Sequence, residues 1–162
     1  ALRHSTFQVA SVMTTTGFAT ADFNQWTALS RTILVLLMFI GACAGSTGGG
    51  MKVSRFLIWF KTVTKEIHLY LHPKTVKQIK MDGKTIAPEV IRSTNVYLVV
   101  YALIFAASVL LIAVDNFDST TNFTAVAATL NNIGPGLNQV GPMSNFSCFS
   151  NYFCFSSMIF CI

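Results

Sequence analysis

Charged residues are absent from four long stretches of this 162-residue sequence. The stretches are residues 4–21, residues 32–51, residues 93–114 and the whole segment after residue 118. A helix needs about 20 mostly apolar residues to cross the hydrocarbon core of a membrane. The second and third stretches meet this requirement, so the pattern predicts two membrane-spanning segments.

The first of these two segments contains a break. Residues 33–40 are continuously apolar, residues 45–50 form a glycine cluster, and apolar residues return at 56–60. We interpret the segment as one helical path interrupted by a glycine loop, because glycine has a low helix propensity. The other segment, 93–114, is continuous, and Pro88 opens its helix at or near the first helical position.

The stretch 4–21 is too short and too polar to span a membrane. Residues 5–13 predict a short helix with a serine or threonine as N-cap, and a run of threonines leads from it to Gly17. We interpret it as a re-entrant half-helix. Laying Gly17 on Gly134 reveals a weak internal repeat, in which a short helix is followed by a polar stretch and a glycine. The repeating unit is therefore a span, a half-helix, a glycine loop and a second span.

Charge indicates which side of the membrane each loop faces. Only 10% of the residues are charged, compared with about 25% in a soluble domain. Nine of the eleven Lys and Arg residues lie between residues 52 and 92. Such a block between apolar segments is typical of a cytoplasmic loop, and the aromatic residues lie in the apolar runs, which argues against nucleic-acid binding. Within the block we expect a helix over 61–72, ended by Pro73, and a hairpin turn at Asp82-Gly83.

The two glycine-containing turns have the composition of an ion filter. A cation that enters a dry membrane needs oxygen atoms in place of its water shell. Backbone carbonyls supply them where glycine lets the chain run extended, and the C-terminal end of a half-helix is negative. Residues 14–18 and 132–135 both follow a half-helix, as in potassium filters. Two ordinary re-entrant turns with packing glycines fit the same pattern equally well.

The glycine cluster 45–50 has three interpretations. A phosphate-binding loop fits poorly, because Met51 stands where that motif requires lysine and no strand precedes the cluster. A simple helix break or close helix packing is the second. The third is a mobile gate. The cluster is too polar for lipid contact, so we expect it to face the pathway.

Three motifs together carry a resemblance to a known family. They are Thr14-Thr15-Thr16-Gly17-Phe18, the glycine cluster with Lys52, and the run Asn131-Asn132-Ile133-Gly134-Pro135-Gly136. In this order and spacing they resemble the Trk/Ktr/HKT potassium transporters, and among them the bacterial TrkH-type membrane subunit. The resemblance implies an all-α polytopic membrane protein with potassium-channel-like repeats of span, half-helix, filter loop and span. It implies four such units in a full chain, of which this sequence covers the third filter through the fourth.

The resemblance also implies roles for individual residues. The potassium-binding filter residues are then Thr15, Thr16, Gly17, Asn132, Ile133 and Gly134. The gate residues are Gly45, Ser46, Thr47, Gly48, Gly49, Gly50 and Lys52. Potassium is the transported ion, and no organic cofactor and no other metal is expected. The implied partners are a cytoplasmic NAD- or ATP-binding regulatory subunit, a second copy of the full-length subunit and membrane lipid, in a bacterial inner membrane that the chain crosses several times.

The sequence divides into four parts on this interpretation. Residues 1–72 form the third repeat, residues 73–88 a cytoplasmic linker with a hairpin, and residues 89–142 the fourth repeat. The tail 143–162 lacks charge and is rich in Phe, Cys and Ser, which indicates a truncated span or an altered reading frame; we favour the latter. We expect such a partial chain to be inactive alone.

Two other functions are compatible with parts of the pattern. A secondary transporter of another small solute is also built from broken helices in repeats, but it needs a polar pocket at the midplane. A membrane enzyme that binds nucleotide phosphate at the glycine loop needs metal-binding acids near it, and none is close in sequence. His68 and His72 have the spacing of a metal-binding pair, but no third ligand follows at a suitable distance. We therefore expect a transporter and not an enzyme.

Overall fold

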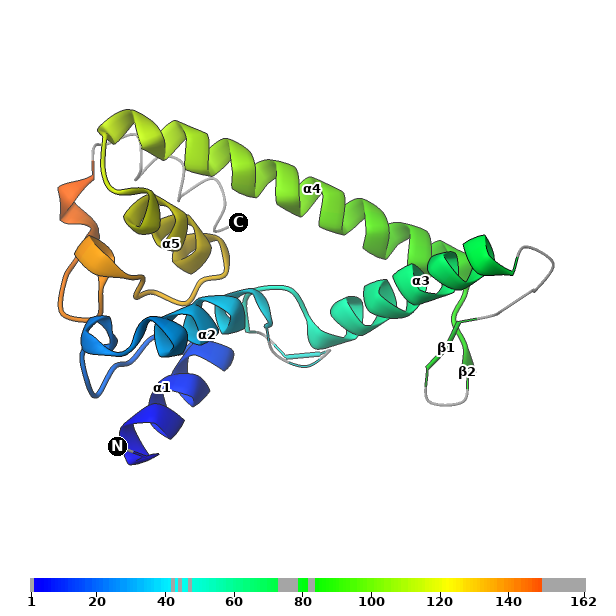
Figure 1. Cartoon of the computed structure of the whole chain (residues 1–162), viewed down its shortest axis with the longest axis horizontal. Helices are drawn as coiled ribbons and strands as arrows, with labels where there is room; N and C mark the ends of the chain where they lie inside the picture. The colour runs from blue at the N-terminus through cyan, green and yellow to red at the C-terminus, as the bar shows by residue number, and fades with distance from the viewer. Residues whose placement is uncertain are drawn as a thin grey trace.

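The computed structural model describes residues 2–41, 43, 45–46, 48–72, 79–81 and 84–149. Within them lie five helices, one two-stranded hairpin and four short 3-10 turns (Figure 1). The helices are α1 (Leu2–Met13), α2 (Ala28–Phe39), α3 (Val53–Leu71), α4 (Pro88–Ile112) and α5 (Ser119–Leu130). The strands are β1 (Lys80–Met81) and β2 (Lys84–Thr85), and the turns are η1 (Phe23–Gln25), η2 (Ala113–Asp115), η3 (Asn138–Val140) and η4 (Phe146–Cys148).

Helix α4 runs along the length of the molecule, and α5 and α3 pack against its two halves (Figure 1). Its C-terminal half contacts α5, while its N-terminal half contacts α3 near the hairpin. Helix α2 lies between the two half-helices, because it packs against both α1 and α5. Both half-helices, α1 and α5, therefore lie at the same end of the molecule.

The helix expected over the continuous segment is confirmed. Residues Pro88–Asp115 form a stretch of 28 residues that is long and apolar enough to cross a membrane, the one such stretch in the described part of the chain. Proline occupies the first turn of α4, as expected, since its missing N–H has no helical partner there.

The other segment is broken, as expected, but the break begins earlier than the glycine cluster. Helix α2 holds 12 residues and ends at Phe39, so the chain leaves the helix at Ile40 and not at Gly45. Ile40 forms a parallel bridge with Met51, and the N–H of Gly41 donates to the carbonyl of Met51 at 2.8 Å. These main-chain bonds close the loop at its base, which explains the early end of α2.

The start of the first half-helix also differs from the prediction. Helix α1 already includes Leu2, three residues before the expected start. Ser5 Oγ and Thr6 Oγ1 both donate to the carbonyl of Leu2 at 3.0 Å. These hydroxyls therefore bond back within the helix and do not cap its N-terminus.

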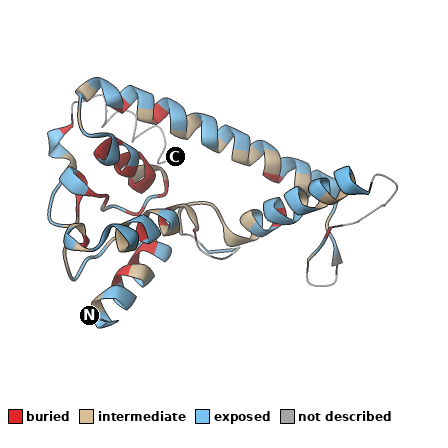
Figure 2. Cartoon of the chain, viewed as in Figure 1, coloured by how far each residue is buried: buried red, intermediate tan, exposed pale blue. Residues whose placement is uncertain are grey.

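The core surrounds α5, the most deeply buried helix (Figure 2). Small residues such as Ala125 and Ala127 let it pack closely between α2 and α4. One buried cluster joins α1, α2, α5 and the chain around Gly134. Its members are Val12, Phe23, Leu34, Met38, Ala127, Ile133 and Leu137. The rings of Phe39, Phe105 and Phe123 meet where α2, α4 and α5 converge, with centroids 5.1–6.0 Å apart.

The predicted hairpin is present beside α3. Lys80 pairs with Thr85 and Met81 with Lys84 in antiparallel register. The expected turn residues Asp82 and Gly83 lie outside the described residues, as does Pro73. At the other end of the chain, Phe149 packs against the ring of Phe117 at 4.9 Å, and the tail interpretation falls mostly on residues 150–162, which also lie outside the described part.

Candidate functional site

The two half-helices end in the same way. Each holds 12 residues, and laying Gly17 on Gly134 also lays Leu2 on Ser119 and Met13 on Leu130. Two main-chain N–H groups close each end with the crossed bonds of a Schellman motif. The bonds correspond one to one: Thr15 to Val12 (3.2 Å) and Thr16 to Ser11 (3.0 Å), then Asn132 to Thr129 (3.1 Å) and Ile133 to Ala128 (2.8 Å). The weak sequence repeat is therefore a structural repeat.

The backbone conformations after the two helices also match. Thr15 and Asn132 are left-handed, with φ of 55° and 54°, and two residues later Gly17 and Gly134 have φ of 77° and 109°. Asparagine tolerates the left-handed region, but a β-branched threonine there is a genuine outlier. Strain of this kind persists where neighbouring contacts hold it, and it is common at ligand clamps and switches.

The two glycine turns lie directly against each other. A β-carbon added to Gly17 would overlap the carbonyl oxygen of Ile133, and one added to Gly134 would lie 3.9 Å from the α-carbon of Gly17. The half-helices α1 and α5 thus direct their C-terminal ends to one place, where the two glycine turns meet. The negative ends of two helices there favour a cation over an anion.

Side chains hold the chain that follows each glycine against its own half-helix. Ser11 Oγ donates to the carbonyl of Phe18 at 2.7 Å, and the buried Gln8 donates through Nε2 to the carbonyl of Ala21 at 3.1 Å. In the second copy, Thr124 Oγ1 accepts from the N–H of Leu137 at 3.1 Å. The two copies use different side chains for the same purpose, so the repeat is one of backbone geometry more than of sequence.

A pair of asparagines links the segments that follow the two glycine turns. Asn24 Oδ1 accepts from the N–H of Asn138 at 2.9 Å, and Asn24 Nδ2 donates to the carbonyl of Asn138 at 3.2 Å. Asn138 Nδ2 also donates to Asp118 Oδ2 at 3.0 Å, before the start of α5. Asp22 accepts from the N–H of Asn24 at 3.0 Å and so orders the turn that carries the pair.

The glycine cluster lies against both turns. The N–H of Gly49 donates to Thr15 Oγ1 at 3.2 Å. A β-carbon at Gly49 would overlap the carbonyl of Asn131, so only glycine permits this approach. The same threonine hydroxyl donates to the carbonyl of Thr14 at 2.7 Å. Thr15 is thus fixed by contacts on both sides, which accounts for its unusual backbone.

Lys52 holds the cluster closed on itself. Its ammonium group donates to the carbonyls of Ser46 and Gly48, the latter at 2.7 Å. These two bonds satisfy carbonyls that no helix satisfies, and they bring a positive charge to the loop. Gly45, Ser46, Gly48, Gly49, Gly50 and Lys52 therefore belong to one closed loop beneath the turns, while Thr47 lies outside the described residues.

The sequence alone assigned no role to two residues of the site. Asn131 is completely buried, donates to the carbonyl of Ala127 at 2.8 Å, and accepts from the hydroxyl of Tyr101 at 2.8 Å. Tyr101 therefore anchors the second turn to the spanning helix α4. The available signal was an asparagine within a charge-free stretch, because a buried amide requires hydrogen-bond partners.

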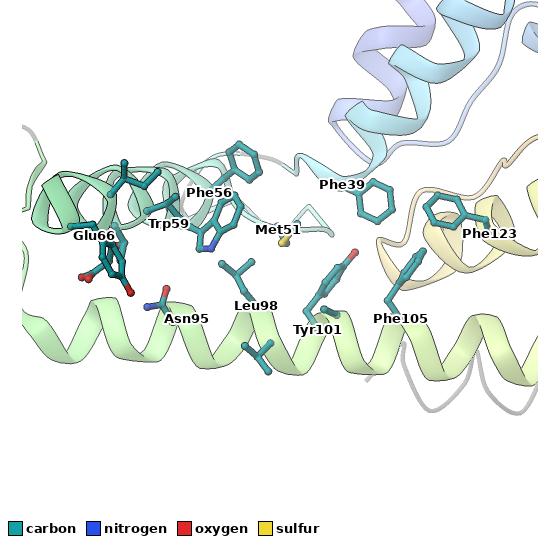
Figure 3. Close-up of a pocket in the computed structure, with 16 residues that line it drawn as sticks. Phe39, Met51, Phe56, Trp59, Glu66, Asn95, Leu98, Tyr101, Phe105 and Phe123 are labelled. Atoms are coloured by element: carbon teal, nitrogen blue, oxygen red, sulfur yellow. The ribbon is translucent and has the colours of Figure 1, made fainter.

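An apolar groove of about 860 Å³ borders the site between α3 and α4 (Figure 3). Figure 3 shows Phe39, Phe105 and Phe123 at one end and Glu66 with Asn95 at the other. Tyr101 lines the groove beside Met51, the residue after the glycine cluster. In the described part of the chain there is no group of three His, Cys, Asp or Glu side chains that could hold a metal ion. The rings of His68 and His72 meet edge to face, with centroids 5.0 Å apart.

Comparison with known proteins agrees with this architecture. A family model for TrkH, described as cation transport protein, matches residues 1–162. The chain is 40% identical to the potassium uptake protein TrkH of Salmonella typhimurium over 139 residues, which are 86% of this chain and 29% of that protein.

The chain belongs to the TrkH family. It is 31% identical to the potassium uptake protein TrkI of Halomonas elongata over 147 residues, which are 90% of this chain and 30% of that protein. The crystal structure of the potassium transporter TrkH from Vibrio parahaemolyticus matches with a TM-score of 0.77 and 34% identity, covering 98% of this chain and 38% of that chain.

Membership of the TrkH family confirms several expectations. The fold is that of an all-α polytopic membrane protein, and the relatives are transport proteins and not enzymes. The chain spans less than a third of the length of the curated relatives named above.

Proposed function

We propose that this chain supplies two of the filter turns, and the gate, of a potassium uptake protein. The observation that carries the proposal is the meeting of two half-helices that end identically, at Thr15 and Asn132, with their glycine turns in contact. Relatives of the chain are named potassium uptake proteins, which supports potassium as the transported ion. The ion is a substrate and passes through without a chemical reaction.

In this proposal the filter residues coordinate potassium through oxygen atoms. Gly17, Gly134 and Ile133 contribute carbonyls, while Thr15, Thr16 and Asn132 contribute further oxygens at the ends of the turns. A ring of carbonyls replaces the hydration shell of the ion, and the two helix ends stabilise its charge. The contact of Gly17 with the carbonyl of Ile133 supports a shared site, because it brings the two turns together.

The glycine cluster acts as the gate in the same proposal. Its N–H at Gly49 bonds the hydroxyl of Thr15, so the loop covers one end of a proposed filter turn. Lys52 stabilises this closed arrangement through Ser46 and Gly48. Opening requires only that a few hydrogen bonds of a loop without helical bonds are broken, each of which contributes about 1 kcal/mol. The helices that carry the filter can remain in place.

We infer a wider setting that the chain would need. The parts 1–72, 73–88 and 89–142 act as the third repeat, a cytoplasmic linker and the fourth repeat of a longer subunit in a bacterial inner membrane. That subunit forms a homodimer and is controlled by a cytoplasmic NAD- or ATP-binding protein. The chain alone is inactive, because a filter of four turns surrounds the ion in potassium channels.

Uptake of radioactive rubidium by liposomes that contain the full-length subunit tests the function. We expect rubidium uptake that excess potassium suppresses and excess sodium does not. A subunit that imports an amino acid or an anion, and whose rubidium uptake equals that of empty liposomes, would support the other candidate, a secondary transporter of another solute.

A further inference from the structure

A basic face of α3 lies apart from the site described above. Lys61, Lys65 and His68 are spaced by three or four residues, so they share one side of the helix. The hairpin strand β1 approaches this side, as Figure 1 shows. Between them is a pocket of about 430 Å³, lined by Phe60, Lys61, Thr64, Lys65, His68, Ile79 and Lys80. Among the described residues its lining contains no carboxylate.

The pocket is held together by a specific contact. Lys61 Nζ donates to the carbonyl of Lys80 at 2.8 Å, which links α3 to the hairpin. An ammonium group has three donors, so Lys61 keeps two for a ligand while its position is fixed. Glu66, the nearest acid in sequence, lines the groove towards α4 instead. Among the described residues no carboxylate neutralises the positive charge of the pocket, so this charge can attract an anion.

The same face of α3 changes character along the helix. Leu57, one turn before Lys61, and Phe60, the residue directly before it, are 46% and 62% exposed. The apolar part lies towards the glycine loop and the basic part towards the hairpin. This order is that of a membrane interface on the cytoplasmic side, where lysines extend towards headgroups and apolar side chains contact acyl chains.

We propose that this pocket binds the phosphate of an anionic phospholipid in the cytoplasmic leaflet. Lys61, Lys65 and Lys80 contact the phosphate, and Thr64 and His68 offer further hydrogen bonds. Phe60 and Leu57 lie along the acyl chains. A soluble phosphate compound has no acyl chain to contact these apolar side chains, so the occupant is a lipid. The proposal rests on the cytoplasmic orientation of the basic block in the proposed function, but it does not depend on the ion path.

Native mass spectrometry of the full-length subunit in detergent, with phosphatidylglycerol or phosphatidylcholine added, tests the pocket. We expect preferential retention of phosphatidylglycerol. Each lysine near an anionic lipid contributes about fivefold in affinity, so Lys61→Gln with Lys65→Gln should weaken binding by about 25-fold. The pair Lys61→Arg and Lys65→Arg should keep binding near the wild-type level, which controls for folding.

Arg92, a basic residue near the start of α4 that does not line the pocket, gives the matched control. Arg92→Gln should change phosphatidylglycerol binding less than twofold, whereas Lys65→Gln alone should lower it about fivefold. Equal losses in these two variants, or full competition by glycerol phosphate, would overturn the lipid site. Rubidium uptake measured on the same preparation reports on the proposed function separately, since lipid binding in detergent needs no ion flow.

Discussion

At the scale of single residues, Thr15 and Asn132 occupy equivalent positions, but the left-handed backbone costs more free energy at threonine than at asparagine. The repeat in the sequence predicted that the two turns correspond, and their hydrogen bonds do. The left-handed backbone at Thr15 could not be predicted, because threonine rarely adopts it and the contacts that hold it, with Gly49 and Thr14, leave no signal in the sequence. Tyr101 was likewise visible only as one aromatic residue of a spanning helix.

The two glycines of the proposed filter should respond differently to alanine. Gly17→Ala places a β-carbon on the carbonyl of Ile133, whereas Gly134→Ala meets nothing closer than 3.9 Å, although both have positive φ. We therefore expect Gly17→Ala to reduce the preference for potassium over sodium more strongly. The reduction should be about tenfold or more, if misplacing one carbonyl weakens potassium binding by about 1.4 kcal/mol. Uptake of the two ions by the full-length subunit in liposomes measures this. Unchanged selectivity in both variants would refute the filter assignment.

The hydroxyl of Tyr101 should stabilise the second turn. Tyr101→Phe removes the hydroxyl that donates to Oδ1 of the fully buried Asn131, and leaving this oxygen without a donor costs about 1–3 kcal/mol. We expect a lower melting temperature of the full-length subunit and weaker potassium selectivity. Tyr97→Phe is the control, because the ring of Tyr97 packs under Arg55 at 4.2 Å and phenylalanine preserves that ring. Equal effects of both substitutions would argue against a special role for Tyr101.

At the scale of elements, the interruption between α2 and α3 was predictable but its boundaries were not. The glycine cluster indicates a break, and the structure begins it at Ile40. The reason is the main-chain closure of Gly41 on Met51, in which side chains take no part. Helix α4 was predicted almost to its ends, because a long apolar run with a proline start leaves few alternatives.

The glycine cluster should limit flux. Deleting residues 46–50 removes the loop beneath the turns, so we expect faster potassium uptake by the full-length subunit with the preference for potassium retained. Gly49→Ala should act in the same direction, since its β-carbon would displace the loop from Asn131. Gly45→Ala, which has a positive φ but nothing within 4 Å of the added carbon, shows the effect of backbone strain alone. If the deletion inserts correctly but abolishes uptake, the loop is not a gate.

At the scale of the whole molecule, the order of elements followed from the sequence and the connection between repeats did not. Apolar runs, a basic block and two glycine turns predict spans, half-helices and their order. The bonds between Asn24 and Asn138 join residues 114 positions apart, and a single sequence holds no signal for them. The position of each half-helix in the assembly is fixed by such contacts and by the packing of α5 between α2 and α4.

The two ends of the molecule should lie on opposite sides of the membrane. In a full-length subunit without its natural cysteines, His72→Cys should react with an impermeant thiol reagent only from the inside. Met143→Cys, at a residue that is 82% exposed near the second turn, should react only from the outside. Labelling of His72→Cys from outside intact cells would reverse the proposed topology.

The most direct test of the central claim is to locate the ion. Crystals of the full-length subunit grown with rubidium should show anomalous scattering from rubidium between the turns 15–17 and 132–134, within coordination distance of the carbonyls of Gly17 and Ile133. Excess sodium in the soak should leave the signal in place, because the site prefers the larger ion, whereas excess potassium should remove it. Rubidium bound elsewhere in the pathway, with both glycine turns unoccupied, would contradict the assignment of these turns as the potassium filter.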